Sequence, residues 1–130
     1  MTNPRGRILI VDDEPALLKM MSTYLRRLGY TVTAANSTEA AWKEAQASPA
    51  QFDMAVIDAT MTGMSMEVLA RQLLRANPSI VVIASSGYPL DTAAVAAEAP
   101  GRVAFLLKPY SPEVLADTVR RMLGAQEEKL

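Results

Sequence analysis

Four charged residues stand directly after apolar runs of the sequence. They are Asp12 and Asp13 after Ile8–Val11, Asp58 after Met54–Ile57, and Lys108 after Val103–Leu107. Carboxylate oxygens bind hard divalent cations such as Mg²⁺, and a carboxylate can also attack phosphorus to give an aspartyl phosphate. A lysine ammonium can pair with the phosphoryl oxygens. If the apolar runs are parallel strands, these charges meet at one edge of one sheet and predict a site for a cation and a phosphoryl group.

Each of these residues also has an ordinary structural explanation. Adjacent Asp12 and Asp13 cannot both point the same way from a strand, and they repel each other unless a cation lies nearby. Such a pair is equally typical of a solvated loop or a helix cap. Asp58 could form a turn, and Lys108 could extend its ammonium into solvent. The order of the residues, each at the end of a strand, favours one shared site.

The composition excludes several classes of chemistry. The chain has no cysteine and no histidine, which excludes disulfides, thiolate or histidine metal sites, Ser-His-Asp catalysis and a phosphohistidine on this chain. Thirteen basic residues against fourteen acidic ones give a net charge of −1, which does not favour nucleic-acid binding. The N-terminus lacks the apolar stretch of a signal peptide, and no apolar run reaches the length of a membrane span. We expect a cytoplasmic protein without a membrane partner.

Apolar runs alternate with helical patterns along the chain. The expected strands are Ile8–Val11, Tyr30–Ala35, Phe52–Ile57, Ile80–Ala84 and Val103–Leu107. The expected helices are Pro15–Leu28, Ser37 or Thr38 to Ala47, Glu67–Ala76, Asp91–Glu98 and Pro112–Leu123. Gly124 is expected to end the last helix, so residues 125–130 would form a frayed tail. The 130 residues suit a single domain, 1–130, with a core at about residues 6–124.

This alternation predicts an α/β fold, a parallel sheet covered by helices on both faces. Ligands bind such sheets beyond the carboxyl ends of the strands, where the four charges stand. The strand Tyr30–Ala35 is more polar than the others, so we expect it at an edge. The helix Asp91–Glu98 is rich in alanine and has little large apolar surface with which to pack.

The sequence resembles the receiver domain of two-component response regulators over about residues 6–124. The motifs that carry the resemblance are Ile10-Val11-Asp12-Asp13-Glu14-Pro15, Asp58 with Met61 and Met64, Ser86-Gly87, and Phe105 with Lys108-Pro109. The segment Val103–Pro109, with Ser86-Gly87-Tyr88 before it, is especially similar to receivers attached to hybrid sensor kinases. The resemblance implies a flavodoxin-like, doubly wound (βα)5 fold with a five-stranded parallel sheet of order 2-1-3-4-5.

The resemblance also assigns a role to each acidic residue. Asp58 would be the phosphoacceptor. Asp13, Asp58 and the backbone carbonyl of Thr60 would bind Mg²⁺ directly, with Mn²⁺ as an alternative, and Asp12 would act through water. Such a domain is a phosphoacceptor and not an enzyme in the ordinary sense, because it catalyses only its own phosphorylation and dephosphorylation.

The remaining motifs would bind the phosphoryl group and switch the domain. By resemblance, Ser86, Gly87 and Lys108 would contact the phosphoryl group. Phe105 would be the aromatic residue that turns inward when Ser86 moves. The peptide bond between Lys108 and Pro109 would be cis, although cis is the minority state of proline in general.

The implied partners are proteins. A histidine kinase or a phosphotransfer protein would supply the phosphoryl group from a phosphohistidine. The surface of the fourth helix, fifth strand and fifth helix would then change and meet a downstream protein, in a monomer or a weak dimer through that surface. No basic recognition helix follows Leu123, so we expect no direct contact with nucleic acid. The starting Met1 favours a stand-alone regulator over a receiver cut from a longer kinase.

The sequence departs from the family pattern in one loop. Thr62 and Met66 stand where receivers usually carry proline and glycine, which predicts an altered loop path or an altered start of the third helix. Two alternatives to a phosphorelay receiver stay open. One is a degenerate receiver that binds a partner without phosphorylation. The other is a haloacid-dehalogenase-type phosphatase, although that chemistry needs two acids separated by one residue, and Asp12 and Asp13 are adjacent.

Overall fold

Five strands alternate with five helices in the computed structural model, which describes residues 6–48, 51–61 and 63–128, with side chains as far as Gly124. The strands are β1 (Arg7–Val11), β2 (Thr31–Ala35), β3 (Met54–Asp58), β4 (Val81–Ser86) and β5 (Val103–Leu107). The helices are α1 (Pro15–Arg27), α2 (Thr38–Ala47), α3 (Met66–Ala76), α4 (Ala93–Glu98) and α5 (Pro112–Glu128). Each predicted element is present, and the main difference in bounds is at the end of α5.

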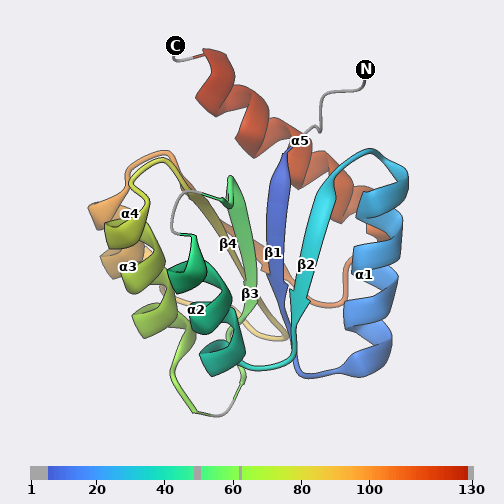
Figure 1. Cartoon of the computed structure of the whole chain (residues 1–130), viewed down its shortest axis with the longest axis horizontal. Helices are drawn as coiled ribbons and strands as arrows, with labels where there is room; N and C mark the ends of the chain where they lie inside the picture. The colour runs from blue at the N-terminus through green and yellow to red at the C-terminus, as the bar shows by residue number, and fades with distance from the viewer. Residues whose placement is uncertain (1–5, 49–50, 62, 129–130) are drawn as a thin grey trace.

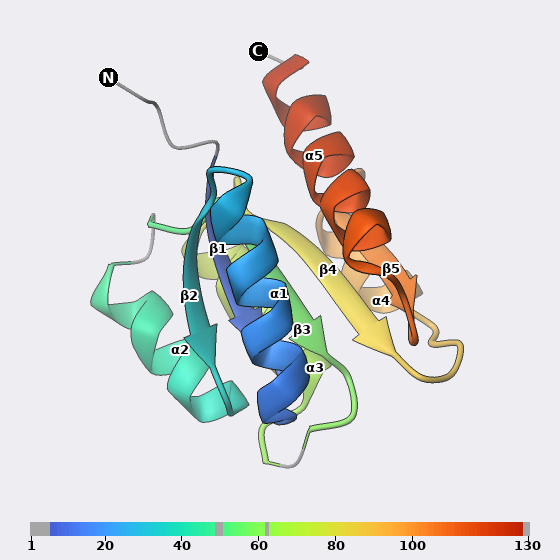
Figure 2. The same ribbon diagram turned by 90° about the vertical axis from the view of Figure 1, so that its right-hand side faces the viewer.

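The strands form one parallel sheet in the order β2-β1-β3-β4-β5, which confirms the predicted topology. The more polar strand β2 lies at an edge, as its sequence indicated. Helices α1 and α5 cover one face of the sheet, and α2, α3 and α4 cover the other (Figure 1). All five strands point toward the same end of the molecule (Figure 2), so their carboxyl ends and the following loops gather there.

The sheet separates two clusters of buried apolar side chains. Successive residues of a strand point to opposite faces, so each central strand contributes to both clusters. Ile10 and Val56 belong to the cluster beneath α1 and α5, whereas their neighbours Val11 and Ile57 belong to the cluster beneath α2, α3 and α4. Within the central strands, even-numbered residues of β1 and β3 therefore face α1 and α5. This alternation decides which side chains meet at the ends of the strands.

Local signals set the ends of the first three helices. Gly29 follows α1 with a φ of 102°, a left-handed conformation that stops the helix. Helix α2 begins after Ser37, whose Oγ accepts a hydrogen bond from the amide of Ala40 at 3.0 Å. Helix α3 begins after Ser65, whose Oγ accepts from the amide of Val68 at 3.1 Å. These serine caps satisfy amides that have no partner within the first turn of a helix.

The predicted end of the last helix is wrong. Helix α5 continues through Gly124 to Glu128, so residues 125–128 are helical and not a frayed tail. Gly124 does not take the left-handed conformation with which a glycine ends a helix, and the alanine, glutamine and glutamates after it favour a helix. The rest of the predicted tail, residues 129 and 130, lies outside the described residues. Among the described residues no helix, α5 included, has the length and apolar character needed to cross a membrane.

Candidate functional site

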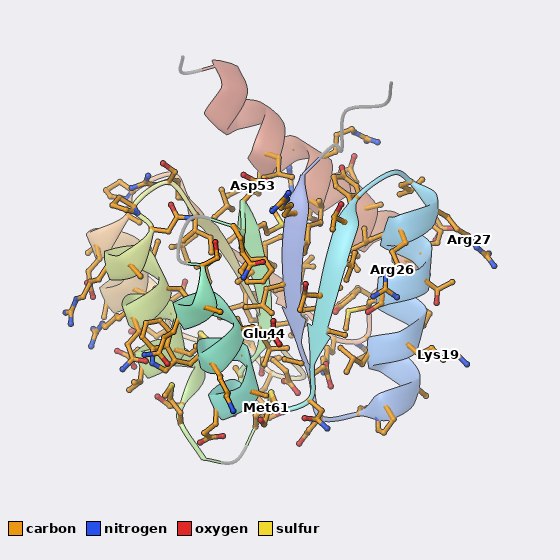
Figure 3. The ribbon with its side chains drawn as sticks, in the orientation of Figure 1. Lys19, Arg26, Arg27, Glu44, Asp53 and Met61 are labelled. Atoms are coloured by element: carbon orange, nitrogen blue, oxygen red, sulfur yellow. The ribbon has the colours of Figure 1, made fainter. Side chains whose placement is uncertain are left out.

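Three charged side chains from separate strands converge on one side of the sheet. Asp12 directly follows β1, Asp58 is the last residue of β3, and Lys108 directly follows β5. Each continues the even-numbered alternation that faces α1 and α5 in its strand. Parallel pairing brings the three strand ends to one edge, and Lys108 thereby meets a residue 96 positions earlier in the chain. Met61, in the loop after β3, lies toward this end of the sheet, whereas Asp53 lies at the other end (Figure 3).

Lys108 joins the two buried carboxylates. Its Nζ lies 3.0 Å from Asp12 Oδ2 and 3.4 Å from Asp58 Oδ2. Asp12 is 1% exposed and Asp58 is 3% exposed, whereas Asp13 is exposed. One oxygen from each of the three carboxylates lies within 4.8 Å of the others. The predicted acidic cluster is therefore assembled, and the ammonium of Lys108 lies beside its two buried carboxylates.

The charges of this cluster fit a divalent cation. Burial lowers the pKa of Lys108, but the hydrogen bond and charge of Asp12, together with those of Asp58, outweigh burial and raise the pKa above its ordinary value. Lys108 is therefore an ammonium at neutral pH. Three carboxylates and one ammonium formally leave two negative charges without a counter-ion, the charge that one Mg²⁺ would neutralise. Three clustered oxygen donors open to solvent at Asp13 suit a hard cation that keeps several waters.

The two buried carboxylates, Asp12 and Asp58, are held by the same pattern of hydrogen bonds. Asp58 Oδ1 accepts hydrogen bonds from the amide and the hydroxyl of Thr60, at 3.1 and 2.9 Å. Asp12 Oδ1 accepts from the amide of Glu14 at 2.9 Å. In both residues the first oxygen is fixed by an amide two positions later and the second faces Lys108. The hydroxyl of Thr60 was not predicted from the sequence, although a threonine two residues after an aspartate is a signal for such a local turn.

The predicted switch residues lie on the other face of the sheet. Ser86 is fully buried, its Oγ accepts from the amide of Tyr88 at 3.2 Å, and its carbonyl accepts from the amide of Lys108 at 2.7 Å. Phe105 is half-buried, and its strand partner is Ala84, two residues before Ser86, so Phe105 and Ser86 share a face. A side chain at Gly87 would meet nothing within 4 Å, so this position is open.

The peptide bond between Lys108 and Pro109 is cis, the geometry that the resemblance implied. After this bond comes Tyr110, which sequence reasoning did not single out. Its hydroxyl donates to Met21 Sδ at 3.1 Å and so connects the site to α1. Burial raises the pKa of Tyr110, and the ammonium of Lys108 offsets part of that rise. Tyr110 lies beyond the end of β5 and after the cis bond, so strand alternation gave no signal for it.

The free energy of unfolding should fall as the pH rises above about 10. The pKa values of Tyr110 and Lys108 are raised above their ordinary values of 10.0 and 10.5. The folded protein therefore keeps protons that the unfolded chain releases in this range, and stability declines from there upward. Urea unfolding between roughly pH 9 and 11 measures the decline. Tyr110→Phe should make it shallower, and an unchanged slope would contradict this assignment.

A known protein family matches most of this chain. The family described as response regulator receiver domain matches residues 8–120. The chain belongs to the response regulator receiver domain family. Receivers are phosphoacceptor domains and not enzymes in the ordinary sense. The acidic cluster and Lys108 of this chain are consistent with that role in two-component signalling. The phosphatase alternative is therefore set aside.

Receivers from several longer proteins are similar to this chain. It is 35% identical over 120 residues to sensor kinase CckA of Brucella abortus, covering 92% of this chain and 13% of that protein. It is 35% identical over 124 residues to the alginate biosynthesis transcriptional regulatory protein AlgB of Pseudomonas putida, covering 95% of this chain and 27% of that protein. The receiver thus spans a small part of these curated relatives.

Solved receiver structures have the same fold. The receiver domain from hybrid histidine kinase CckA is 30% identical, with a TM-score of 0.79 and coverage of 91% of this chain and 99% of that one. A CheY-like receiver from Methanospirillum hungatei is 26% identical, with a TM-score of 0.85 and coverage of 96% and 98%. The predicted resemblance to receivers of hybrid sensor kinases is confirmed.

Proposed function

We propose that Asp58 accepts a phosphoryl group from a phosphohistidine of a histidine kinase or phosphotransfer protein. The observation that carries the proposal is the environment of Asp58, a buried carboxylate with one oxygen held by Thr60 and the other beside Lys108. In the transfer an oxygen of Asp58 attacks phosphorus and forms the O–P bond. The P–N bond to the imidazole breaks, and the imidazole nitrogen takes up a proton from solvent. We place this reaction in the cytoplasm, where kinases have ATP.

The acidic cluster would bind the divalent cation that this reaction needs. Asp13, Asp58 and the backbone carbonyl of Thr60 would hold Mg²⁺, or Mn²⁺ in its place, and Asp12 would act through water. Bound there, the cation neutralises charge between the carboxylate and the phosphoryl oxygens. Lys108 would exchange part of its contact with the carboxylates for the phosphoryl oxygens, because these offer new acceptors to the same ammonium.

Phosphorylation would change the surface formed by α4, β5 and α5. Ser86 and the open position Gly87 would contact the phosphoryl group, and Phe105 would move into the space that Ser86 leaves. Helix α4 suits such a change, because it has six residues, of which Val95 is the one that is buried. Elements with few buried contacts are the ones that shift at low cost. A downstream protein, or a second receiver in a weak dimer, would recognise the altered surface.

The direct test is chemical phosphorylation without a kinase. The purified chain should gain one phosphoryl group when it is incubated with Mg²⁺ and acetyl phosphate, as measured by the intact mass. Chelation of the cation by EDTA should abolish the gain, because the carboxylates would then repel the incoming phosphoryl oxygens. No adduct on the parent chain would contradict the proposal and favour a degenerate receiver that binds its partner without phosphorylation.

A further inference from the structure

A carboxylate from α2 contacts the loop between β3 and α3. Glu39 Oε2 accepts a hydrogen bond from the amide of Met64 at 2.8 Å, across 25 positions of the chain. Glu39 lies in the first turn of α2 and is the second residue of this helix. The contact therefore connects a rigid helix to the loop that follows the phosphoacceptor strand.

Gly63 makes this contact possible. Its φ is +86°, a conformation that side chains rarely adopt. A Cβ at this position would lie 2.5 Å from Glu39 Oε2 and 3.0 Å from Glu39 Oε1. The carboxylate thus occupies the space that a side chain would need, and a side chain at residue 63 would displace the Glu39 carboxylate from this contact.

Glu39 is ionised when it makes this contact. The amide of Met64 is the largest cause that lowers the pKa of Glu39, followed by Glu39's own amide, with a smaller contribution from the hydroxyl of Thr38. Desolvation raises the pKa but does not cancel these hydrogen bonds. An amide bonded to an ionised carboxylate forms a stronger hydrogen bond than one bonded to a neutral acceptor.

The loop is consequently held at two points. Near its start, the amide and hydroxyl of Thr60 bind Asp58. Near its end, Met64 binds Glu39. The carbonyl of Thr60 lies between these two anchors in the chain.

We propose that Glu39 is a positioning residue for the cation site, acting through the loop to aim the backbone carbonyl of Thr60. This inference rests on the proposed function, because it assumes that this carbonyl binds the cation. Glu39 itself touches neither the carboxylate cluster nor the phosphoryl group. A purely structural alternative is that Glu39 only stabilises the first turn of α2, where a negative charge is favourable.

Three variants separate these roles. Glu39→Ala removes the acceptor, whereas Glu39→Gln keeps an acceptor oxygen and loses the charge. Glu44→Ala is the matched control, since Glu44 is exposed on the same helix and its carboxylate has no partner among the described residues. The first readout is hydrogen exchange of the Met64 amide without Mg²⁺. We expect exchange to be faster in Glu39→Ala, intermediate in Glu39→Gln and unchanged in Glu44→Ala.

The second readout is the Mg²⁺ dissociation constant from isothermal titration calorimetry. Residues that orient metal ligands typically cost tenfold or more when removed, so Glu39→Ala should weaken Mg²⁺ binding roughly tenfold. Glu39→Gln should recover part of this loss and Glu44→Ala should match the parent. Faster exchange at Met64 with unchanged Mg²⁺ affinity would overturn the proposal, because the contact would then be structural alone. A parent chain that binds Mg²⁺ but takes no phosphoryl group would contradict the proposed function, and the same affinities would still decide the role of Glu39.

Discussion

Asp58→Asn should take up no detectable phosphoryl group under conditions in which the parent chain is phosphorylated, a loss of at least about 100-fold in rate. The amide that replaces the carboxylate is not a nucleophile toward phosphorus, and it is a poorer ligand for a cation. The fold should survive, because an amide oxygen can still accept from Thr60 and Lys108 keeps its contact of 3.0 Å with Asp12. The measurement is the intact mass after incubation with Mg²⁺ and acetyl phosphate, alongside the melting temperature.

The matched control is Asp53→Asn. Asp53 precedes β3 at the end of the sheet away from the site (Figure 3), where its Oδ2 accepts from the amide of Arg7 at 2.8 Å. Asparagine can make the same hydrogen bond, so this variant should be phosphorylated like the parent. A phosphoryl adduct on Asp58→Asn, mapped by fragmentation to another acid such as Asp13, would show that the phosphoacceptor is assigned wrongly.

Lys108→Ala should lower the free energy of unfolding by about 1–3 kcal/mol when Mg²⁺ is absent. Asp12 and Asp58 stay buried in this variant but lose the ammonium that lies between them. Added Mg²⁺ should restore most of the loss. It should also bind more tightly than to the parent, by roughly tenfold, because the two carboxylates no longer share their charge with a competing cation. Urea unfolding with and without Mg²⁺ measures both effects.

Lys19→Ala serves as the control for this prediction. Lys19 extends from α1 into solvent (Figure 3), and no ion pair of its ammonium is found among the described residues. Its removal should change stability by less than about 0.5 kcal/mol and leave the response to Mg²⁺ unchanged. If Lys108→Ala is as stable as the parent without Mg²⁺, or binds Mg²⁺ more weakly, then Lys108 does not neutralise the two carboxylates.

The sequence predicted the charged cluster because simple geometry determines it. Apolar runs followed by Asp12, Asp58 and Lys108 place these residues at the same end of the sheet once the strands are parallel. The order of the strands could not be predicted in the same way, because several runs are equally apolar and nothing in them selects a neighbour. That order followed from the resemblance to receivers, and the sheet confirms it.

Contacts that depend on the path of a loop could not be predicted. Glu39 and Met64 are 25 positions apart, and only the folded loop shows that an amide faces this carboxylate. The expected change at Thr62 falls outside the described residues, while Met66 begins α3 one residue earlier than predicted. The end of α5 was predicted wrongly at Gly124 for another reason. Glycine ends a helix only where it takes a left-handed conformation and the chain turns, whereas α5 continues to Glu128.

The separation of the two apolar clusters has a consequence for substitutions in this chain. The charged residues Asp12, Asp58 and Lys108 share the face of α1 and α5, whereas Ser86 and Phe105 share the face of α2, α3 and α4. The sheet backbone stands between the two sets, so side chains of one cluster can be exchanged without repacking the other. Substitutions among the apolar side chains beneath α2, α3 and α4 should therefore leave the positions of Asp12, Asp58 and Lys108 on the other face unchanged.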